Sequence, residues 1–524
     1  MSSHGDRSPE AELGLLDATM IGMGAMIGAG IFVLTGLAAE TAGPAAILVF
    51  ALNGVVTTFT GLSYAELASA IPKSGGGYAF VNEVFGDLVS FLMGWMLWFA
   101  YMIAGALYAL GFAPNAVELA HVYLTGTVPP PEAVAQTTIT GLALGAVILL
   151  VLLNTASTAA AGSAETVFTI TKVLILVVFV FFGVTAPVFS TAEFQPLFPT
   201  GKSPVDILPA MGLTFIAFEG YDLITTVTEE VENPRENIPR AIFLSLGATV
   251  IVYLSVVGVA IGTLGAERLG SAGETGIAAA AGGFMPEFPL IGGGEALIVF
   301  GAVFSTLTAL NAVVIASSRV AFSMGRDGRL LPRFGQIHHR FGTPAAAILA
   351  SAVVMVLSVA FVPIRQVGNL SSLFFLLSFV VVNGSVIRLR RQRPNLNRPF
   401  EMPLYPAAPV LGIVLNLVLG VFIDPFTWGL GAVWLGLGVV TYYGLESLRD
   451  DESGGEGVPG GGGPGGDPDA EVATDGGVPE RETASTRDVG AEASVDATGV
   501  DHGGDRQITG TAETVNTRDE EGGG

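Results

Sequence analysis

The chain has 524 residues, of which 51% are hydrophobic and only 13% charged, and its formal net charge is −23. A soluble protein of this length would carry about 25% charged residues, so the composition argues against an ordinary soluble globular protein. Because there are no cysteines, disulfides and thiolate chemistry are excluded. The acidic balance argues against a nucleic-acid partner. The five histidines show no metal-ligand spacing, and we expect neither a metal nor a cofactor.

Apolar runs long enough to span a bilayer, about 20 residues each, recur along the chain. They predict an all-α membrane protein with twelve transmembrane helices, whose boundaries are soft by several residues. The expected spans are about 16–40, 43–70, 88–112, 136–156, 163–185, 205–228, 240–265, 294–324, 343–363, 367–388, 406–423 and 427–447.

The distribution of basic residues tests this count, because loops on the cytoplasmic side carry an excess of lysine and arginine. With the N-terminus inside, the outer loops hold only Lys202, Arg268 and Arg365, whereas the inner segments hold most of the arginines. A missed or additional helix would scramble this asymmetry. We therefore expect a multi-pass protein of the cytoplasmic membrane with both termini in the cytoplasm.

Composition divides the chain into three parts: a cytoplasmic N-terminal stub (1–12), a membrane domain (13–448) and an acidic, glycine-rich tail (449–524). From Glu446 onward there are 20 acidic and 5 basic residues, and such a segment cannot bury a core. We expect the tail to be disordered and cytoplasmic; a regulatory or partner-binding tail is the alternative. Acid excess with only three lysines also predicts a high-salt host, where salt screens the repulsion.

Glycines interrupt two of the expected spans at corresponding places. The first carries Gly24, Gly28 and Gly30, and the second carries Glu219 followed by Gly220. Paired interruptions of this kind are the best sequence pointer to a binding site within a membrane protein. Close helix packing through small residues would also explain Gly24 and Gly28. The matching interruption in the sixth span favours two broken helices.

Four ionisable residues lie in or near apolar spans. Lys172 lies inside the fifth span, where it either faces a cavity or reaches the interface with its long side chain. Glu219 lies in an apolar stretch, where it could meet a substrate cation or carry a proton, and Asp222 is expected to cap the resumed helix. Glu66, near the inner end of the second span, is expected at the interface.

Several motifs together resemble the amino acid–polyamine–organocation transporters, nearest the bacterial-type and cationic amino acid permeases. The resemblance covers roughly Leu13 to Leu448. The motifs are residues 24–33 (GAMIGAGIFV), 64–67 (YAEL), 72–78 (PKSGGGY), 229–240 (EEVENPRENIPR) and 318–332 (SRVAFSMGRDGRLLP).

This resemblance implies a LeuT-like inverted repeat of five plus five helices, in which helices 1 and 6 are broken and the last two are peripheral. It implies that amides matching Gly28, Ala29 and Gly30 hold the substrate carboxylate. Carbonyls matching Met26, Ile27, Ile216 and Glu219 would hold its ammonium group, and Phe218 and Gly220 belong to the same second break.

In proton-coupled relatives a lysine of the fifth span takes the place of a sodium ion, and Lys172 matches it. The resemblance implies that Lys172 contacts carbonyls near Gly24 and that Thr308 on span eight lies nearby. Glu219 departs from the family pattern, since an apolar or small polar residue is usual there. Its charge could favour a cationic side chain.

We therefore expect a secondary transporter, not an enzyme, that imports amino acids together with protons by alternating access. Cationic amino acids are one candidate substrate class. Two alternatives stay open: an exchanger without proton coupling, and a membrane sensor that binds amino acids without transporting them. The expected partners are the amino acid, protons and the lipid bilayer.

Overall fold

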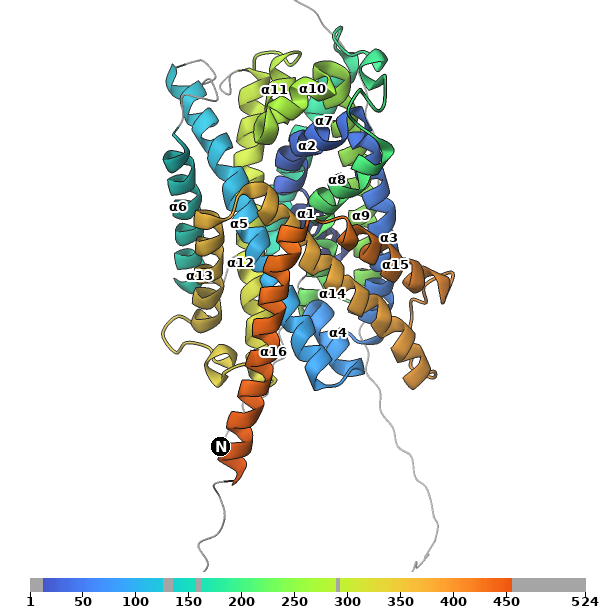
Figure 1. Ribbon diagram of the computed structural model, residues 1–524, viewed down its shortest axis with the longest axis vertical. Helices are drawn as coiled ribbons and strands as arrows, with labels where there is room; N and C mark the ends of the chain where they lie inside the picture. The colour runs from blue at the N-terminus through green and yellow to red at the C-terminus, as the bar shows by residue number, and fades with distance from the viewer. Residues whose placement is uncertain (1–12, 126–134, 157–161, 289–292, 455–524) are drawn as a thin grey trace, which may run out of the picture. The chain divides into compact units, whose positions relative to one another are not determined.

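The computed structural model describes residues 13–125, 135–156, 162–288 and 293–454. The expected stub at 1–12 and the acidic tail from residue 455 onward lie outside the described residues. The part of the chain that is described consists of helices and connecting segments, without a β-strand (Figure 1). A single bridge joins Leu13 to Val231.

Every expected span coincides with helical residues. The first is α1 (Leu15–Met26) and α2 (Ala29–Ala42), and the sixth is α8 (Ile207–Thr214), η5 (Phe215–Phe218) and η6 (Tyr221–Glu230). The others, in chain order, are α3 (Ala46–Ala70), α5 (Asp87–Thr125), α6 (Gln136–Ala156), α7 (Gly162–Thr185), α9 (Pro234–Leu264), α12 (Gly294–Arg326), α13 (Ala345–Phe361), α14 (Ile364–Gln392), α15 (Ala407–Val421) and α16 (Pro425–Gly454).

By length and composition, nine helical stretches within the described ranges could cross a membrane. The first of them, residues 15–70, contains two of the expected spans. The helices α13 and α15 are apolar but shorter. Together these stretches cover all twelve expected segments.

Local chemistry explains where α9 begins and ends. Pro234 occupies its first turn, where a missing N–H costs nothing, and the preceding Asn233 has a left-handed φ of 45°. At the other end the chain turns at Gly265, with φ of 81°, a conformation that a residue without Cβ adopts freely.

The two interrupted segments lie at the centre of the helical domain. In the most apolar windows of residues 15–70 and 204–230, 89% of the residues are buried, whereas only 28% are in α6 and 11% in α16. Figure 1 shows α1, α2 and α8 between α5 on one side and α3 on the other. Helices that are apolar all round and packed inside protein can hold irregular backbone, because neighbouring side chains satisfy the freed groups.

Three short helices were not expected from the sequence: α4 (Gly76–Val84), α10 (Ala266–Ser271) and α11 (Gly276–Gly282). They lie at opposite ends of the domain, α4 at one end and α10 with α11 at the other (Figure 1). Before α4, Ser74 and Glu229 exchange two hydrogen bonds of 3.1 and 3.3 Å between backbone and side chain. This pair ties the start of α4 to the end of η6.

Next to this pair, a hydrogen bond from Lys73 holds the pKa of the Glu83 carboxyl below its usual range.

Glu66 is not interfacial, as the sequence suggested, but buried, with 1% of its side chain exposed. Arg390 of α14 binds both of its oxygens at 2.7 Å, and the backbone N–H of Met402 donates to it at 2.9 Å. Arg390 also lies over the Tyr405 ring at 4.1 Å. Because it has a bidentate partner and a third donor, this carboxylate can be buried without a large loss of stability. This node of Glu66, Arg390 and Met402 joins α3 to α14.

We expect Glu66→Gln to destabilise the protein by about 1–3 kcal/mol, because it removes the charge that pairs with the partly buried Arg390 guanidinium and leaves fewer acceptors for its donors. Thermal unfolding in detergent measures this. The matched control is Glu236→Gln, whose exposed carboxylate pairs with Arg240 at 3.4 Å and should contribute at most about 0.5 kcal/mol. Equal unfolding temperatures for the two variants would contradict the role of this node.

Candidate functional site

The first break lies between α1 and α2, where Ile27 and Gly28 leave the helical conformation. Gly28 has φ of −107° and ψ of −131°, and its N–H turns back to the carbonyl of Met26 at 2.8 Å. A Cβ at Gly28 would lie 2.6 Å from that of Ala309 on α12. The break is therefore packed directly against α12.

The second break lies between η5 and η6, at Glu219 and Gly220. Gly220 has φ of 135°, and a Cβ on it would lie 2.7 Å from both the Cβ of Ala25 and the backbone nitrogen of Met26. Conformation and space thus both require glycine at this position. The two breaks meet here, because Gly220 lies against the end of α1.

Tyr253 of α9 joins the two breaks. Its hydroxyl contacts the carbonyl of Met26 at 2.5 Å and that of Ala217 at 2.8 Å. Its ring packs edge-on against Phe50 and Phe218. The hydroxyl has one proton, so it donates to one of these two carbonyls at a time, and Met26 O also accepts from Gly28 N.

We expect Tyr253→Phe to lower the free energy of unfolding by about 1–3 kcal/mol, because a buried carbonyl, of Met26 or of Ala217, loses the hydroxyl proton that it accepts. The ring contacts are kept, so a larger loss would not be explained by packing. Denaturant unfolding measures the change. Tyr443→Phe, at a side chain that is 55% exposed, serves as the control, and an equal effect in both variants would contradict the bridging role.

Lys172 of α7 is fully buried, and its ammonium donates to the carbonyl of Gly24 at 2.9 Å. This is the contact that the family resemblance implied. The α12 residue that reaches the same break is Ser305, whose hydroxyl donates to the carbonyl of Ile27. Thr308, the expected α12 residue, donates within its own helix to the Ser305 carbonyl at 3.0 Å. Side chains from α7, α9 and α12 thus hold the broken end of α1.

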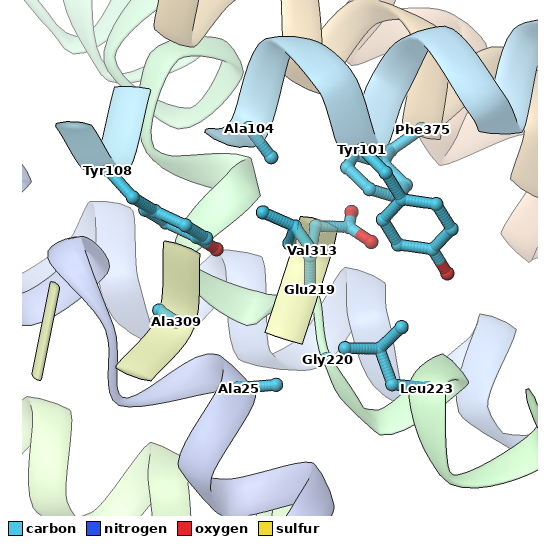
Figure 2. A pocket seen from close by; sticks show the side chains of 10 residues that line it. All are labelled: Ala25, Tyr101, Ala104, Tyr108, Glu219, Gly220, Leu223, Ala309, Val313 and Phe375. Atoms are coloured by element: carbon cyan, nitrogen blue, oxygen red, sulfur yellow. The ribbon is translucent and has the colours of Figure 1, made fainter. Parts of the chain in front are cut away.

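A small cavity of about 10 Å³ lies where the breaks meet, with room for about one water molecule. Figure 2 shows Glu219 between the rings of Tyr101 and Tyr108, with Phe375 beside Tyr101. Small apolar side chains complete the wall: Ala25, Ala104, Leu223, Ala309 and Val313, together with Gly220. In this conformation the interior is closed around the breaks.

The two acidic residues of the second break have different surroundings. Asp222 is buried and accepts hydrogen bonds from the Tyr101 hydroxyl at 2.5 Å and from Gly220 N at 3.0 Å. Asp222 is therefore not the cap that the sequence suggested: Gly220 precedes η6, and Asp222 lies in its first turn and accepts from the N–H behind it. Both oxygens of Glu219 are buried and have no hydrogen-bond partner among the described residues.

The structure brings together both groups of residues that the sequence singled out. Gly30 meets the second break, since a Cβ there would lie 2.6 Å from the Cβ of Ala217, and Ala29 begins the buried helix α2. Ile216 takes part through its N–H, which donates to Ser372 at 3.2 Å, and through its carbonyl, which accepts from Glu219 N at 3.1 Å. Phe218 is buried against Tyr253.

Sequence reasoning missed Tyr101, Tyr108, Tyr253 and Ser305, each of which lies in an ordinary apolar span without a local signal. In the described ranges, no three histidine, cysteine, aspartate or glutamate side chains gather as metal ligands would. The site offers the ends of two interrupted helices with their backbone carbonyls, the buried ammonium of Lys172, and the Glu219 carboxylate, which has no donor among the described residues. These groups bind ions and polar molecules without covalent chemistry.

Comparisons with known proteins agree with this geometry. The profile of a family described as amino acid permease matches residues 13–441. The chain is 30% identical to the branched-chain amino acid permease BcaP of Bacillus subtilis, over 84% of this chain and 94% of that protein. It is 28% identical to the methylthioribose transporter of the same organism, over 82% and 92%, and 31% identical to mouse Asc-type amino acid transporter 1, over 82% and 80%.

These relatives are named as permeases and transporters, which agrees with the expectation that the chain is not an enzyme. The long apolar helices are those of a multi-pass membrane protein. The match extends over nearly the whole helical domain. The chain belongs to the amino acid permease family.

Proposed function

We propose that this protein imports amino acids across the cytoplasmic membrane, coupled to protons, by alternating access. The observation that carries the proposal is the meeting of two broken, buried segments at one cavity, with Lys172 bound to the first of them. Broken helices at corresponding positions are typical of secondary transporters, which bind substrate between their repeats. An inverted repeat of five plus five helices, with α15 and α16 peripheral and both termini cytoplasmic, belongs to the same proposal.

The substrate's own charged groups fit the two breaks. The N–H groups at the start of α2, at Ala29 and Gly30, suit its carboxylate. That of Gly28 belongs to the same proposal, although in this conformation it donates to the Met26 carbonyl. Carbonyls near Ile27, Ile216 and Glu219 suit its ammonium group. Met26 is the weakest of the proposed acceptors, because its carbonyl already serves Gly28 N and the Tyr253 hydroxyl.

Lys172 is the proposed proton carrier. Charged, it holds α7 on the Gly24 carbonyl at 2.9 Å, and neutral, it would hold that carbonyl less strongly. A proton on Lys172 therefore favours one arrangement of α1 against α7, and its loss favours another. Thr308 lies in α12 one turn after Ser305, the residue that contacts the break. Its part in proton transfer is the weaker proposal.

Glu219 is the proposed basis for accepting cationic amino acids. An unpaired buried carboxylate favours a ligand with a positive group beside it. One relative is named for branched-chain amino acids and another as an Asc-type amino acid transporter. Leucine, a branched-chain amino acid, is therefore the neutral substrate with which lysine is compared. A high-salt host, expected from the acidic composition, remains part of the proposal.

Uptake of a panel of labelled amino acids into proteoliposomes tests the function. An importer accumulates its substrate in empty vesicles, whereas an exchanger needs amino acid inside the vesicles and a sensor binds without accumulation. We expect uptake into empty vesicles. Binding of an amino acid without any flux, under every internal loading, would contradict transport.

A further inference from the structure

The carboxylate of Glu219 is the one acidic group at the cavity that the protein leaves without a donor, within the described residues. Both oxygens are buried, and 3% of the residue is exposed. Asp222, three residues later, has the Tyr101 hydroxyl and Gly220 N as donors. The fold therefore stabilises a charge on Asp222 and provides no such support for Glu219.

The groups that face Glu219 come from several elements. From its own segment these are Asp222 and Tyr221, from α5 Tyr101 and Tyr108, and from α3 Tyr64, all of which interact with it electrostatically. Toward the cavity, α12 and α14 present only Ala309, Val313 and Phe375.

The basic side chain of this region is Lys172 of α7, which donates to Gly24 O, one residue before Ala25 of the cavity wall. Asp222 places a second acidic group near Glu219, and the tyrosines are neutral at ordinary pH.

An ionised carboxylate that is buried without donors costs several kcal/mol. The closed site therefore needs either a proton on Glu219 or a cation against it. The rings of Tyr101, Tyr108 and Phe375 line the same cavity, and aromatic faces attract ammonium and guanidinium groups. Both occupants thus suit the same position, which the side chain of an amino acid reaches once the cavity of about 10 Å³ widens.

We propose that a proton and the positive side chain of a basic amino acid compete for Glu219, so that transport of a basic amino acid moves one proton fewer than transport of a neutral one. This deepens the proposed function and rests on it. A neutral amino acid is carried past a protonated Glu219. A basic amino acid displaces that proton to the side from which it entered.

The proton balance follows from one cycle. When the basic amino acid leaves on the other side, Glu219 takes a proton there and returns with it. The proton count per amino acid is then one lower for lysine than for leucine, while the positive charge of the lysine side chain replaces the missing proton. The net charge moved per amino acid is equal for the two substrates.

The test measures proton flux and charge movement per labelled amino acid in proteoliposomes, for leucine and for lysine. We expect one proton fewer with lysine and the same charge with both. In Glu219→Gln the difference in proton count should vanish, and lysine affinity should fall more than tenfold while leucine affinity changes less than threefold. Glu236→Gln, which changes an exposed carboxylate paired with Arg240, should behave as the wild type.

A binding measurement in detergent separates this inference from transport itself. As the pH is lowered and Glu219 becomes protonated, lysine affinity should fall up to tenfold per pH unit. Leucine affinity should fall much less over the same pH range. Equal proton counts for the two substrates would overturn the proposal, as would leucine binding without lysine binding at any pH from 5 to 9. Absence of all flux with this pH-dependent lysine binding would refute transport but support the competition at Glu219.

Discussion

Replacing Lys172 by alanine should abolish accumulation driven by a pH gradient, while amino acid binding persists. The side chain is buried and donates to the Gly24 carbonyl at 2.9 Å, so its removal takes away the hydrogen bond from α7 to the broken end of α1. Without a group that gains and loses a proton, the pH gradient has nothing to act on. Labelled leucine should then equilibrate across the membrane instead of concentrating inside the vesicles.

Two further variants make this result specific. Lys172→Arg keeps the positive charge but cannot release its proton at accessible pH, and we expect it to lose proton-driven accumulation as well. Lys202→Ala removes a lysine that contacts the backbone of Glu40 and should leave accumulation unchanged. Full proton-driven uptake by Lys172→Ala would exclude this lysine as the proton carrier.

Gly30→Ala should weaken amino acid binding by about 5- to 150-fold. The added Cβ would lie 2.6 and 2.7 Å from the Cβ and Cα of Ala217, so it pushes apart the breaks that form the site. Such overpacking costs about 1–3 kcal/mol, and 1.4 kcal/mol is tenfold in affinity. Equilibrium binding of labelled amino acid to purified protein measures it.

Gly247→Ala is the matched control, because a Cβ at Gly247 of α9 would meet nothing within 4 Å. Within a helix this change should stabilise slightly, by about 0.5–1 kcal/mol. The first atoms that a side chain at Gly30 would meet are those of Ala217. Wild-type affinity in a folded Gly30→Ala protein would contradict the assignment of this break to the site.

The helices and both breaks could be predicted because their signals are local. Long apolar runs fix the spans, and glycines within them mark where the helix stops, as Gly28 and Gly220 show. The expected cap at Asp222 is displaced by two residues, because the helix resumes directly after Gly220 and Asp222 falls within its first turn. The short helices α4, α10 and α11 were missed because too few residues carry each pattern.

The connections between elements could not be predicted, because they join residues far apart in sequence. Tyr253 reaches Met26 across 227 positions and Ser305 reaches Ile27 across 278. Glu66 was assigned to the interface because its partner Arg390 lies 324 positions away. Polarity indicates that a buried charge needs a partner, but only the packing of α3 against α14 shows which one.

The most direct test of the central claim is leucine uptake by the wild-type protein in proteoliposomes, with an inward pH gradient and no sodium. We predict that labelled leucine rises inside above its outside concentration, that a protonophore abolishes this rise, and that added sodium leaves it unchanged. Strict dependence on sodium, or equilibration without accumulation under the pH gradient, would contradict proton-coupled import through the paired breaks and Lys172.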